Sequence, residues 1–437
     1  MSDRWLYAWG LASVGLGGAS LVVPLYVVAL GGGPVTLGVL AAAAAFAGVP
    51  GALGVGWLAD RTGHRRRYIL AAIGAVAVSL AVVPAVESIP VVVAVNAVLW
   101  FAFAAALPVL TLLVVVDTPE SAWSDRIARL NRIQGIGWAL GLLVGFCVVL
   151  AGEVAAIPSI AAQRVVCLVC AASAGGGGVV ALRSLPADAD SETGPGPNRL
   201  RRAIRGASRF GVRGASFPFT PRAVDPRRLH PRRFVRRFTP DLALFFVAIA
   251  LVFAGFGAFF APLPAYLAAV GFGDQAVFGL YLVLNVGAAA FFGVSARLTA
   301  RYETMLVHVG ALAVRGVAIP AVVVTGGALA PAALVFAAIG CAWAVIAVTA
   351  GTLVTRLSPA VVRGEALGVY SALSAAAGGV GSIAGGWLAA RAYLRAFGVA
   401  GGLVLVGAGV VALLRWRVRR RAADDPERSL YSLDSTE

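Results

Sequence analysis

The chain has 437 residues, of which 60% are hydrophobic and 13% are charged, and its mean hydropathy is +0.88. A water-soluble protein of this length needs a much larger share of charge to cover its surface, so the composition excludes a soluble fold and predicts a membrane protein. The net charge of +16 comes from arginine alone, because the sequence contains no lysine, and this also excludes the lysine-containing phosphate loop of ATP-driven proteins.

Apolar segments of about 20 residues, the length at which a helix crosses the hydrocarbon core, recur along the chain. They carry apolar residues on all faces, which argues against buried helices of a soluble protein. The sequence therefore predicts an all-α membrane protein with twelve spans, six in each half. The expected spans are 5–30, 36–58, 68–87, 90–116, 131–151, 165–182, 241–269, 275–296, 304–325, 331–354, 367–390 and 397–416.

The arginines are distributed unevenly between the loops. With the N-terminus in the cytoplasm, 32 arginines fall on the cytoplasmic side, three (Arg164, Arg391 and Arg395) fall outside, and Arg315 lies within a span. Cationic loops are translocated poorly. The distribution therefore predicts that both termini are cytoplasmic, in the inner or plasma membrane of the cell.

The second half of the chain repeats features of the first half at an offset of 237 residues, as where Gly56-Trp-Leu-Ala-Asp60 aligns with Gly293-Val-Ser-Ala-Arg297. Two pseudo-symmetric six-helix bundles follow, and such pairs place a substrate site near the bilayer midplane. We expect an N-terminal bundle at 1–182, a cytoplasmic loop at 183–240, a C-terminal bundle at 241–416 and a cytoplasmic tail at 417–437.

The predicted central loop contains fourteen arginines and eight prolines. Its segment 199–214 has the pattern of a basic amphipathic helix, which suits an anionic lipid surface. No aromatic-interleaved module accompanies the arginines, so we expect membrane lipids rather than nucleic acid as the partner of this loop.

A charged motif follows the second predicted span: Gly56-Trp-Leu-Ala-Asp60-Arg61-Thr-Gly63-His-Arg65-Arg66-Arg67. Its glycines permit close helix contact and a tight turn, and its arginines hold the cytoplasmic boundary. The motif resembles the G-x-x-x-D-R-x-G-R-R signature of the major facilitator superfamily, with His64 in place of a frequent arginine. Together with the spans and the repeat, the resemblance covers essentially the whole chain.

The resemblance implies a monomeric transporter that works by alternating access, without a cofactor. It also implies that Asp60 braces the start of span eleven, at Arg363, when the protein faces outward. Arg61 or Arg65 would pair with an acid after span four, and Asp117 and Glu120 are the candidates. The alternative is that these charges only set the topology.

Glycine-rich segments occur in spans five and eleven. Gly381-Ser382-Ile-Ala-Gly385-Gly386 resembles the G-P-x-x-G-G element that drug-exporting members carry in span five, with serine for proline and in the other half. Span five has Gly137, Gly141 and Gly145 without that proline. Close helix packing is the alternative explanation for both sets.

Arg315 is the one arginine predicted inside a span, with His308 two turns earlier. Charged residues at this depth are functional candidates by default. The resemblance places span nine at the periphery. Three roles for Arg315 therefore stay open: substrate binding or coupling, packing against carbonyls or Asn285, and snorkelling of the charge through a water defect. The other substrate-binding candidates are polar and aromatic residues of the central spans: Ser13, Ser20, Asn96, Trp100, Trp138, Tyr281, Asn285, Trp343, Tyr370 and Ser374.

An aromatic, largely neutral cavity suits amphipathic compounds. The leading hypothesis is therefore a secondary transporter that exports amphipathic or drug-like molecules, driven by an ion gradient or working as a facilitator. The alternatives are an importer of a small organic solute or anion, and a non-transporting receptor or scaffold with the same fold.

We expect neither catalysis nor a metal site, because the three histidines are scattered and Cys167-Leu-Val-Cys170 lacks a second pair of ligands.

Overall fold

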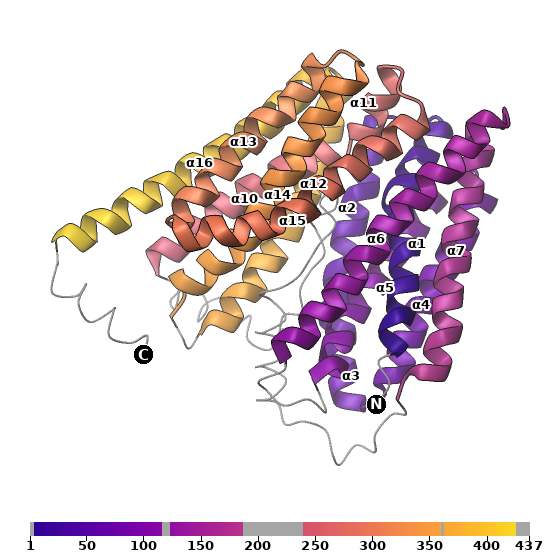
Figure 1. Ribbon diagram of the computed structural model, residues 1–437, viewed down its shortest axis with the longest axis horizontal. Coiled ribbons are helices and arrows are strands. Elements are labelled where there is room, and N and C mark those ends of the chain that lie inside the picture. Colours follow the sequence, from indigo (N-terminus) through magenta and orange to yellow (C-terminus); the bar gives the residue numbers. More distant parts are fainter. Residues whose placement is uncertain (1–3, 116–122, 187–238, 360–361, 425–437) are drawn as a thin grey trace.

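The computed structural model describes residues 4–115, 123–186, 239–359 and 362–424, and every element in these ranges is a helix (Figure 1). The first half comprises α1 (Arg4–Ala29), α2 (Pro34–Pro50), η1 (Gly51–Val55), α3 (Gly56–Thr62), α4 (Arg65–Val82), η2 (Val83–Ala85), α5 (Ile89–Val115), α6 (Trp123–Val154) and α7 (Ser159–Ser184). The second half comprises α10 (Pro240–Phe260), α11 (Leu263–Ala269), α12 (Asp274–Arg301), α13 (Thr304–Val324), α14 (Leu329–Leu357), α15 (Arg363–Ala389) and α16 (Tyr393–Asp424).

Eleven segments of the described residues are long and apolar enough to cross a membrane. The remaining predicted span, 36–58, is formed by α2, the π-helix η1 and α3 in direct succession. The interruption follows Pro50, the last residue of α2, where the missing N–H of proline weakens a regular α-helix. The seventh predicted span also divides, into α10 and α11, at Ala261 and Pro262. The prediction of a twelve-helix membrane protein is thus confirmed, with breaks in two of the spans.

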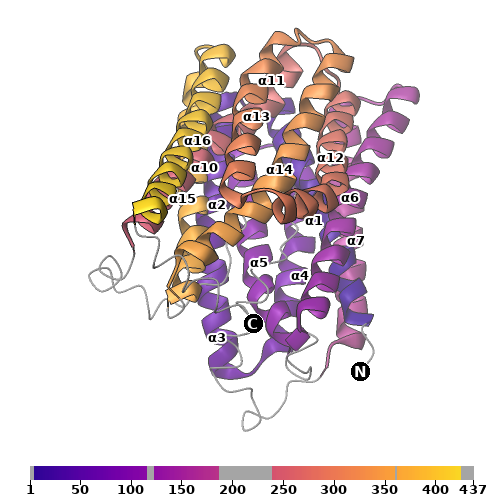
Figure 2. The ribbon, with the colours of Figure 1, turned by 60° about the vertical axis from the view of Figure 1, so that its left-hand side comes forward.

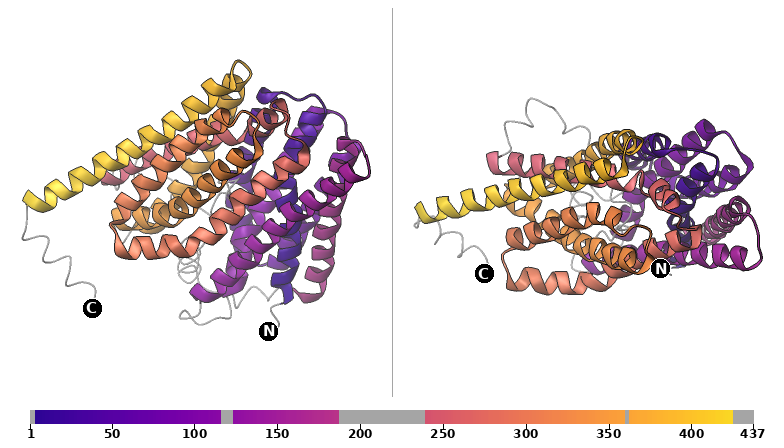
Figure 3. Two further views of the ribbon diagram at one scale, coloured as in Figure 1. Left: turned by 45° about the horizontal axis from the view of Figure 1, so that its top comes forward. Right: turned by 90° about the horizontal axis from the view of Figure 1, so that it is seen from above.

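The helices form two bundles, one from each half of the chain (Figures 1 and 3). In the first bundle α1 packs against α6 and α7, and in the second bundle α10 packs against α15 and α16. Both bundles contain a crossing where only glycine fits. A Cβ atom on Gly141 of α6 would lie 2.1 Å from the carbonyl oxygen of Val14 in α1. A Cβ atom on Gly257 of α10 would lie 2.1 Å from the carbonyl oxygen of Gly378 in α15. Gly141 and Gly378 are separated by the predicted repeat offset of 237 residues, so the internal repeat places equivalent crossings in the two bundles.

The bundles converge at one end of the molecule and diverge toward the end where the N-terminus and the end of α16 lie (Figures 1 and 2). The arginine distribution predicts that the diverging end is cytoplasmic. We call it the inner end, and we call the converging end the outer end. At the outer end α2 packs directly on α15 of the other bundle, and α6 packs on α12.

At the inner end, α16 continues to Asp424, beyond the predicted end of its span at residue 416. Glu303, which precedes α13, pairs with two arginines of α16, at 2.9 Å from Nε of Arg415 and 2.5 Å from Nη2 of Arg419. Arg421 pairs with Asp241 of α10 at 2.8 Å. These ion pairs hold the extension of α16 against the beginnings of two other helices of its own bundle, although pairs this exposed contribute little to stability.

Candidate functional site: the cavity between the two bundles

A cavity lies between the bundles, with about 520 Å³ of empty space, part of it open to solvent. Residues of α1, α2 and α5 line it from the first bundle, and residues of α10, α11 and α12 line it from the second. The lining residues are Ala19, Ser20, Pro24, Leu37, Leu40, Ala41, Asn96, Trp100, Phe260, Ala261, Pro264 and Tyr281. The wall is therefore apolar and aromatic, with four hydrogen-bonding side chains (Ser20, Asn96, Trp100 and Tyr281), and none of its residues carries a formal charge at neutral pH.

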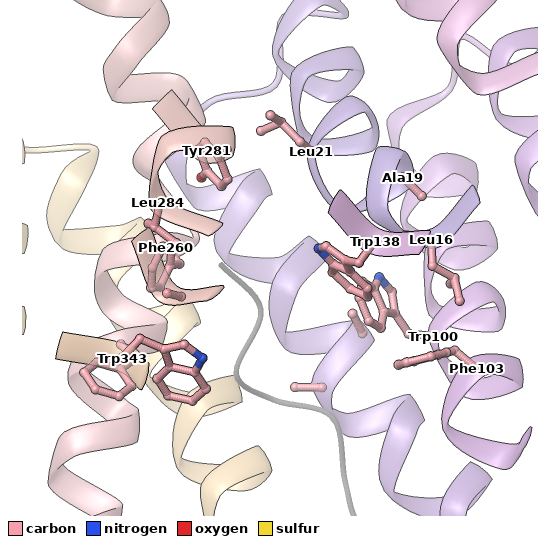
Figure 4. Close-up of a cluster of buried hydrophobic side chains, with 14 of the residues drawn as sticks. Leu16, Ala19, Leu21, Trp100, Phe103, Trp138, Phe260, Tyr281, Leu284 and Trp343 are labelled. Carbon is pink, nitrogen blue, oxygen red and sulfur yellow. The ribbon is translucent and has the colours of Figure 1, made fainter. Parts of the chain in front are cut away.

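An aromatic cluster backs the cavity on the side of the first bundle (Figure 4). The ring of Trp100 lies 5.7 Å from that of Phe103 in an edge-to-face arrangement and 6.0 Å from that of Trp138. Phe103 in turn stacks on Trp9, whose Nε1 donates a hydrogen bond of 3.2 Å to Oε1 of Gln134. The indole N–H of Trp138 is buried and has no hydrogen-bond partner among the described residues. The cluster gives the cavity a rigid aromatic wall with one free donor behind it.

A second aromatic group lies on the side of the other bundle and surrounds Arg315. The guanidinium carbon lies 4.1 Å from the ring centroid of Phe256, 5.2 Å from that of Trp343 and 5.4 Å from that of Phe260. Nη1 of Arg315 donates a long hydrogen bond of 3.4 Å to the carbonyl oxygen of Ile339. Arg315 is fully buried, and Phe260, one of the rings next to it, also lines the cavity. We call Phe256, Phe260 and Trp343 the aromatic cage.

Four of the residues predicted to bind substrate line the cavity: Ser20, Asn96, Trp100 and Tyr281. Trp138, Trp343 and Arg315 lie behind the lining. Of the remaining candidates, Tyr370 packs its ring edge-to-face against that of Phe253 in α10, at 6.1 Å between the ring centroids. The polar groups of the other three are bonded within their own helices. Ser13 donates to the carbonyl of Trp9, Ser374 donates to that of Tyr370, and Asn285 donates to that of Tyr281. Such i to i−4 bonds satisfy a polar group inside a helix without any ligand.

Phe260 and Pro264 line the cavity and are absent from the sequence prediction. Both flank the break between α10 and α11, which follows from Pro262. A proline inside a predicted span, near its end, was the signal that could have found them, because broken helices commonly border transporter cavities.

The outer end of the cavity is closed by direct contact between the bundles. A Cβ atom on Gly38 of α2 would lie 2.5 Å from the carbonyl oxygen of Ser382 in α15, so these helices touch through their backbones. Nearby, Nε2 of Gln163, in the first turn of α7, donates a hydrogen bond of 2.6 Å to Oδ2 of Asp274 at the start of α12. Gln163 and Asp274 form a polar latch between the two bundles.

The charged motif lies at the inner end, far from these contacts. Gly63 ends α3 with a left-handed φ of 71°, as the predicted tight turn requires. Nη2 of Arg66 donates a hydrogen bond of 2.6 Å to the carbonyl of Leu182 in α7. The helix α3 packs on η1, α4 and α5 of its own bundle. Asp60 is expected to contact the start of α15, at Arg363. The side chain of Arg363 is exposed, and its Nε donates a long hydrogen bond of 3.4 Å to the carbonyl oxygen of Ser358.

Several residues of the expected gate lie outside the described residues. These are the side chain of Asp60 and the whole of Asp117 and Glu120, and for Gly56 only its place at the start of α3 is described. The same holds for most of the predicted central loop, including the expected amphipathic helix at 199–214, and for the end of the predicted tail. The pairing of Asp60, Arg61 and Arg65 therefore stays a prediction.

The glycine-rich segment of α15 packs on two helices. A Cβ atom on Gly381 would lie 2.0 Å from the carbonyl oxygen of Ala254 in α10, and one on Gly386 would lie 2.5 Å from that of Pro34 in α2. In α6, a Cβ atom on Gly137 would lie 2.4 Å from the carbonyl oxygen of Gly10 in α1. Close helix packing accounts for these glycines.

A sequence profile described as Major Facilitator Superfamily matches residues 5–380 of the chain. The chain belongs to the Major Facilitator Superfamily. No curated protein sequence matches it significantly. Its assignment to the superfamily therefore comes from the profile, supported by the fold.

Solved structures of other superfamily members are similar over nearly the whole chain. The nucleoside transporter NupG is 15% identical with a TM-score of 0.69, in a match that covers 95% of this chain and 98% of the other. The human organic anion transporter MFSD10 (TETRAN) is 16% identical with a TM-score of 0.57, covering 93% and 98%. A bacterial homologue of the human lysosomal transporter Spinster, in an inward-facing and occupied conformation, is 12% identical with a TM-score of 0.66, covering 94% and 95%. Identities this low show the shared fold and leave the substrate open.

Proposed function

We propose that this superfamily member is a secondary transporter that exports amphipathic small molecules by alternating access. The observation that carries the proposal is the cavity between the bundles, whose wall combines Trp100, Phe260 and Tyr281 with the polar side chains of Ser20 and Asn96. Flat aromatic surfaces with few hydrogen-bonding groups bind ligands that have an apolar body and a small polar part.

The arrangement of the bundles agrees with one step of such a cycle. With the arginine-rich end in the cytoplasm, contact at the outer end and divergence at the inner end correspond to a state that faces inward. An exporter loads its substrate in this state and releases it after the contacts at the outer end have opened.

Import of a small organic solute is the second candidate. The structural neighbours include a nucleoside transporter and an organic anion transporter, so the fold accommodates different cargo. Import and export use the same cavity, and the direction follows from the gradient that drives the cycle.

The proposal is tested with the purified full chain and a panel of lipophilic cations, neutral drugs, sugars and organic anions. A ligand that binds only the folded state raises the apparent stability by mass action. We expect amphipathic compounds to raise the melting temperature, and Trp100→Ala and Tyr281→Ala to reduce the effect. Trp416→Ala is the matched control, because this tryptophan is 54% exposed on α16, away from the cavity.

Flux of the stabilising compound is then measured in proteoliposomes, with substrate loaded on either side. Export from the inner side supports the proposal, and uptake alone would favour the importer. If no class of compound stabilises the protein or crosses the membrane, the transport proposal fails and the scaffold hypothesis takes its place.

A further inference from the structure

Within the described helices, the middle of the membrane contains a positive charge and no negative one. Arg315 is the twelfth residue of α13 and is fully buried. The acidic residues, in contrast, lie no deeper than the third residue from an end of any described helix. A buried charge is costly unless it is paired, and this one forms no ion pair with a described residue.

The contacts of Arg315 leave part of its guanidinium unsatisfied. The aromatic cage offers cation–π attraction, and the carbonyl of Ile339 accepts one long hydrogen bond from Nη1. Nε and Nη2 are buried and have no hydrogen-bond partner in the described part of the chain. Both are obligatory donors, so the site has unused capacity for acceptor oxygens.

The unsatisfied donors lie next to the cavity. Phe260 lines the cavity, and the centroid of its ring lies 5.4 Å from the guanidinium carbon of Arg315. The indole N–H of Trp343, a second member of the aromatic cage, is also buried without a partner among the described residues. Figure 4 shows Phe260 and Trp343 on one side of the space between the bundles, with Trp100 and Trp138 on the other. A residue of the cavity wall is therefore in direct contact with a concentrated set of unsatisfied donors.

We propose that the cavity selects amphipathic organic anions, with Arg315 as the group that attracts the acidic end of the substrate. The apolar body lies against Trp100 and Tyr281, and the acidic end is directed to the aromatic cage. Rotation of the Phe260 side chain brings a carboxylate, sulfonate or phosphate oxygen to Nε or Nη2 of Arg315. Even without rotation, the charge acts on the cavity from beside Phe260, because Coulomb attraction is weakly screened at a water-poor site.

The inference rests on the proposed transport function and narrows its substrate class. It also disfavours cationic substrates, because the described helices place no carboxylate in the middle of the membrane to receive them. The long, planar fork of arginine suits a two-oxygen acceptor better than the ammonium of lysine does.

The test compares two ligands with the same body, 1-pyrenebutyrate and its neutral amide, on the purified full chain. Binding is measured by titration and by thermal shift. We expect the wild-type protein to bind the carboxylate roughly tenfold more tightly than the amide, or better. Arg315→Gln is expected to remove this preference while binding of the amide changes little, and Arg315→Lys is expected to keep part of it.

Arg356→Gln is the matched control. It removes the same charge from the same bundle, at the exposed inner end of α14, where Nη1 of Arg356 is 3.2 Å from the hydroxyl of Thr304. This variant is expected to keep the wild-type preference. If Arg315→Gln does not fold, the wild-type ratio and Arg315→Lys still decide the question.

Equal binding of the carboxylate and the amide by the wild-type protein would overturn the inference and leave the transport proposal standing. An anion preference that survives in Arg315→Gln would also overturn it. The absence of binding and flux for every class of compound would instead count against transport itself.

Discussion

Gly63 shows how one residue sets the geometry of the charged motif. Its φ of 71° lies in the left-handed region, and its N–H donates a hydrogen bond of 3.1 Å to the carbonyl of Ala59. This ends α3 and lets α4 begin at Arg65, two residues later. The turn therefore positions the three consecutive arginines at the start of α4.

Replacement of this glycine should destabilise the protein through its backbone. Gly63→Ala is expected to lower the free energy of unfolding by about 1–2 kcal/mol, because a Cβ atom makes the left-handed conformation unfavourable. Gly74→Ala is the control, because Gly74 lies inside α4 with open space around it and a normal helical φ. Thermal unfolding of the two variants measures the difference, and equal stability would contradict a role for the left-handed turn.

Asp60 is the residue of the motif with the clearest predicted role in the transport cycle. The resemblance to the superfamily motif predicts that Asp60 contacts the start of α15 in the outward-facing state. In the structure the bundles diverge at the inner end, where Asp60 and the start of α15 lie (Figure 1). An aspartate that faces the N-terminus of a helix stabilises that contact through the helix dipole and its free N–H groups.

Asp60→Ala is therefore expected to insert and fold normally and to transport at least about tenfold more slowly, since one state of the cycle loses a charge-assisted contact. Asp241→Ala is the matched control, because Asp241 is also an acid at the inner end but pairs with Arg421 within its own bundle. Initial transport rates in proteoliposomes check the prediction. Near-normal rates for Asp60→Ala would show that the motif only sets the topology.

At the scale of the elements, the contact between α2 and α15 determines which end of the protein is closed. A Cβ atom on Gly38 would approach the backbone of α15 to 2.5 Å, and one on Gly386 would approach that of α2 to the same distance. Backbones this close allow dispersion contacts over the whole helix crossing. The same closeness makes the crossing sensitive to any added side chain.

Gly38→Val is expected to separate α2 from α15 and to shift the population toward states that are open at the outer end. The shift is measured in a variant with Tyr281→Cys in the cavity and the exposed Cys147 replaced by serine. A membrane-impermeant thiol reagent added outside should label this cysteine several times faster when Gly38 is valine. Gly33→Ala is the control, because Gly33 lies at the same end with open space around it. Unchanged labelling would mean that the helix crossing does not hold the outer end closed.

At the scale of the whole molecule, alternating access requires that the outer end can open. Gln163 and Asp274 join the bundles there at a distance of 2.6 Å, so a covalent link between these positions should prevent opening. The cavity itself would remain intact and accessible from the inner end.

The double variant Gln163→Cys and Asp274→Cys, joined by a short bifunctional thiol reagent in the Cys147→Ser background, is expected to lose transport and to keep ligand binding. The control link joins Glu87→Cys to Arg164→Cys, whose native side chains pair at 2.7 Å within one bundle. Flux before and after cross-linking measures the effect. Transport that continues through the cross-linked latch would exclude rocking of the bundles at this end.

The sequence by itself determined the class of this protein, the number of its spans, its internal repeat and its superfamily. Each of these properties is encoded in short segments of the chain. The thickness of the bilayer sets the length of each apolar segment, and a short motif can be recognised without knowledge of the residues that pack around it. A third of the residues that line the cavity could also be predicted from the sequence, since tryptophans, tyrosines and asparagines in central spans are natural candidates. Trp100, Tyr281 and Asn96 proved to be among the lining residues.

Only the tertiary structure decided which side of each helix borders the cavity. When a helix is apolar on all faces, its sequence does not indicate which face is turned toward the cavity. The sequence therefore could not show that Phe260 lines the cavity whereas Trp343 is buried behind the lining. The break at Pro262, the aromatic cage around Arg315 and the contact at the outer end all depend on packing between segments far apart in the chain. Side chains in such contacts are placed by the fit of neighbouring helices, which local hydrophobicity does not encode.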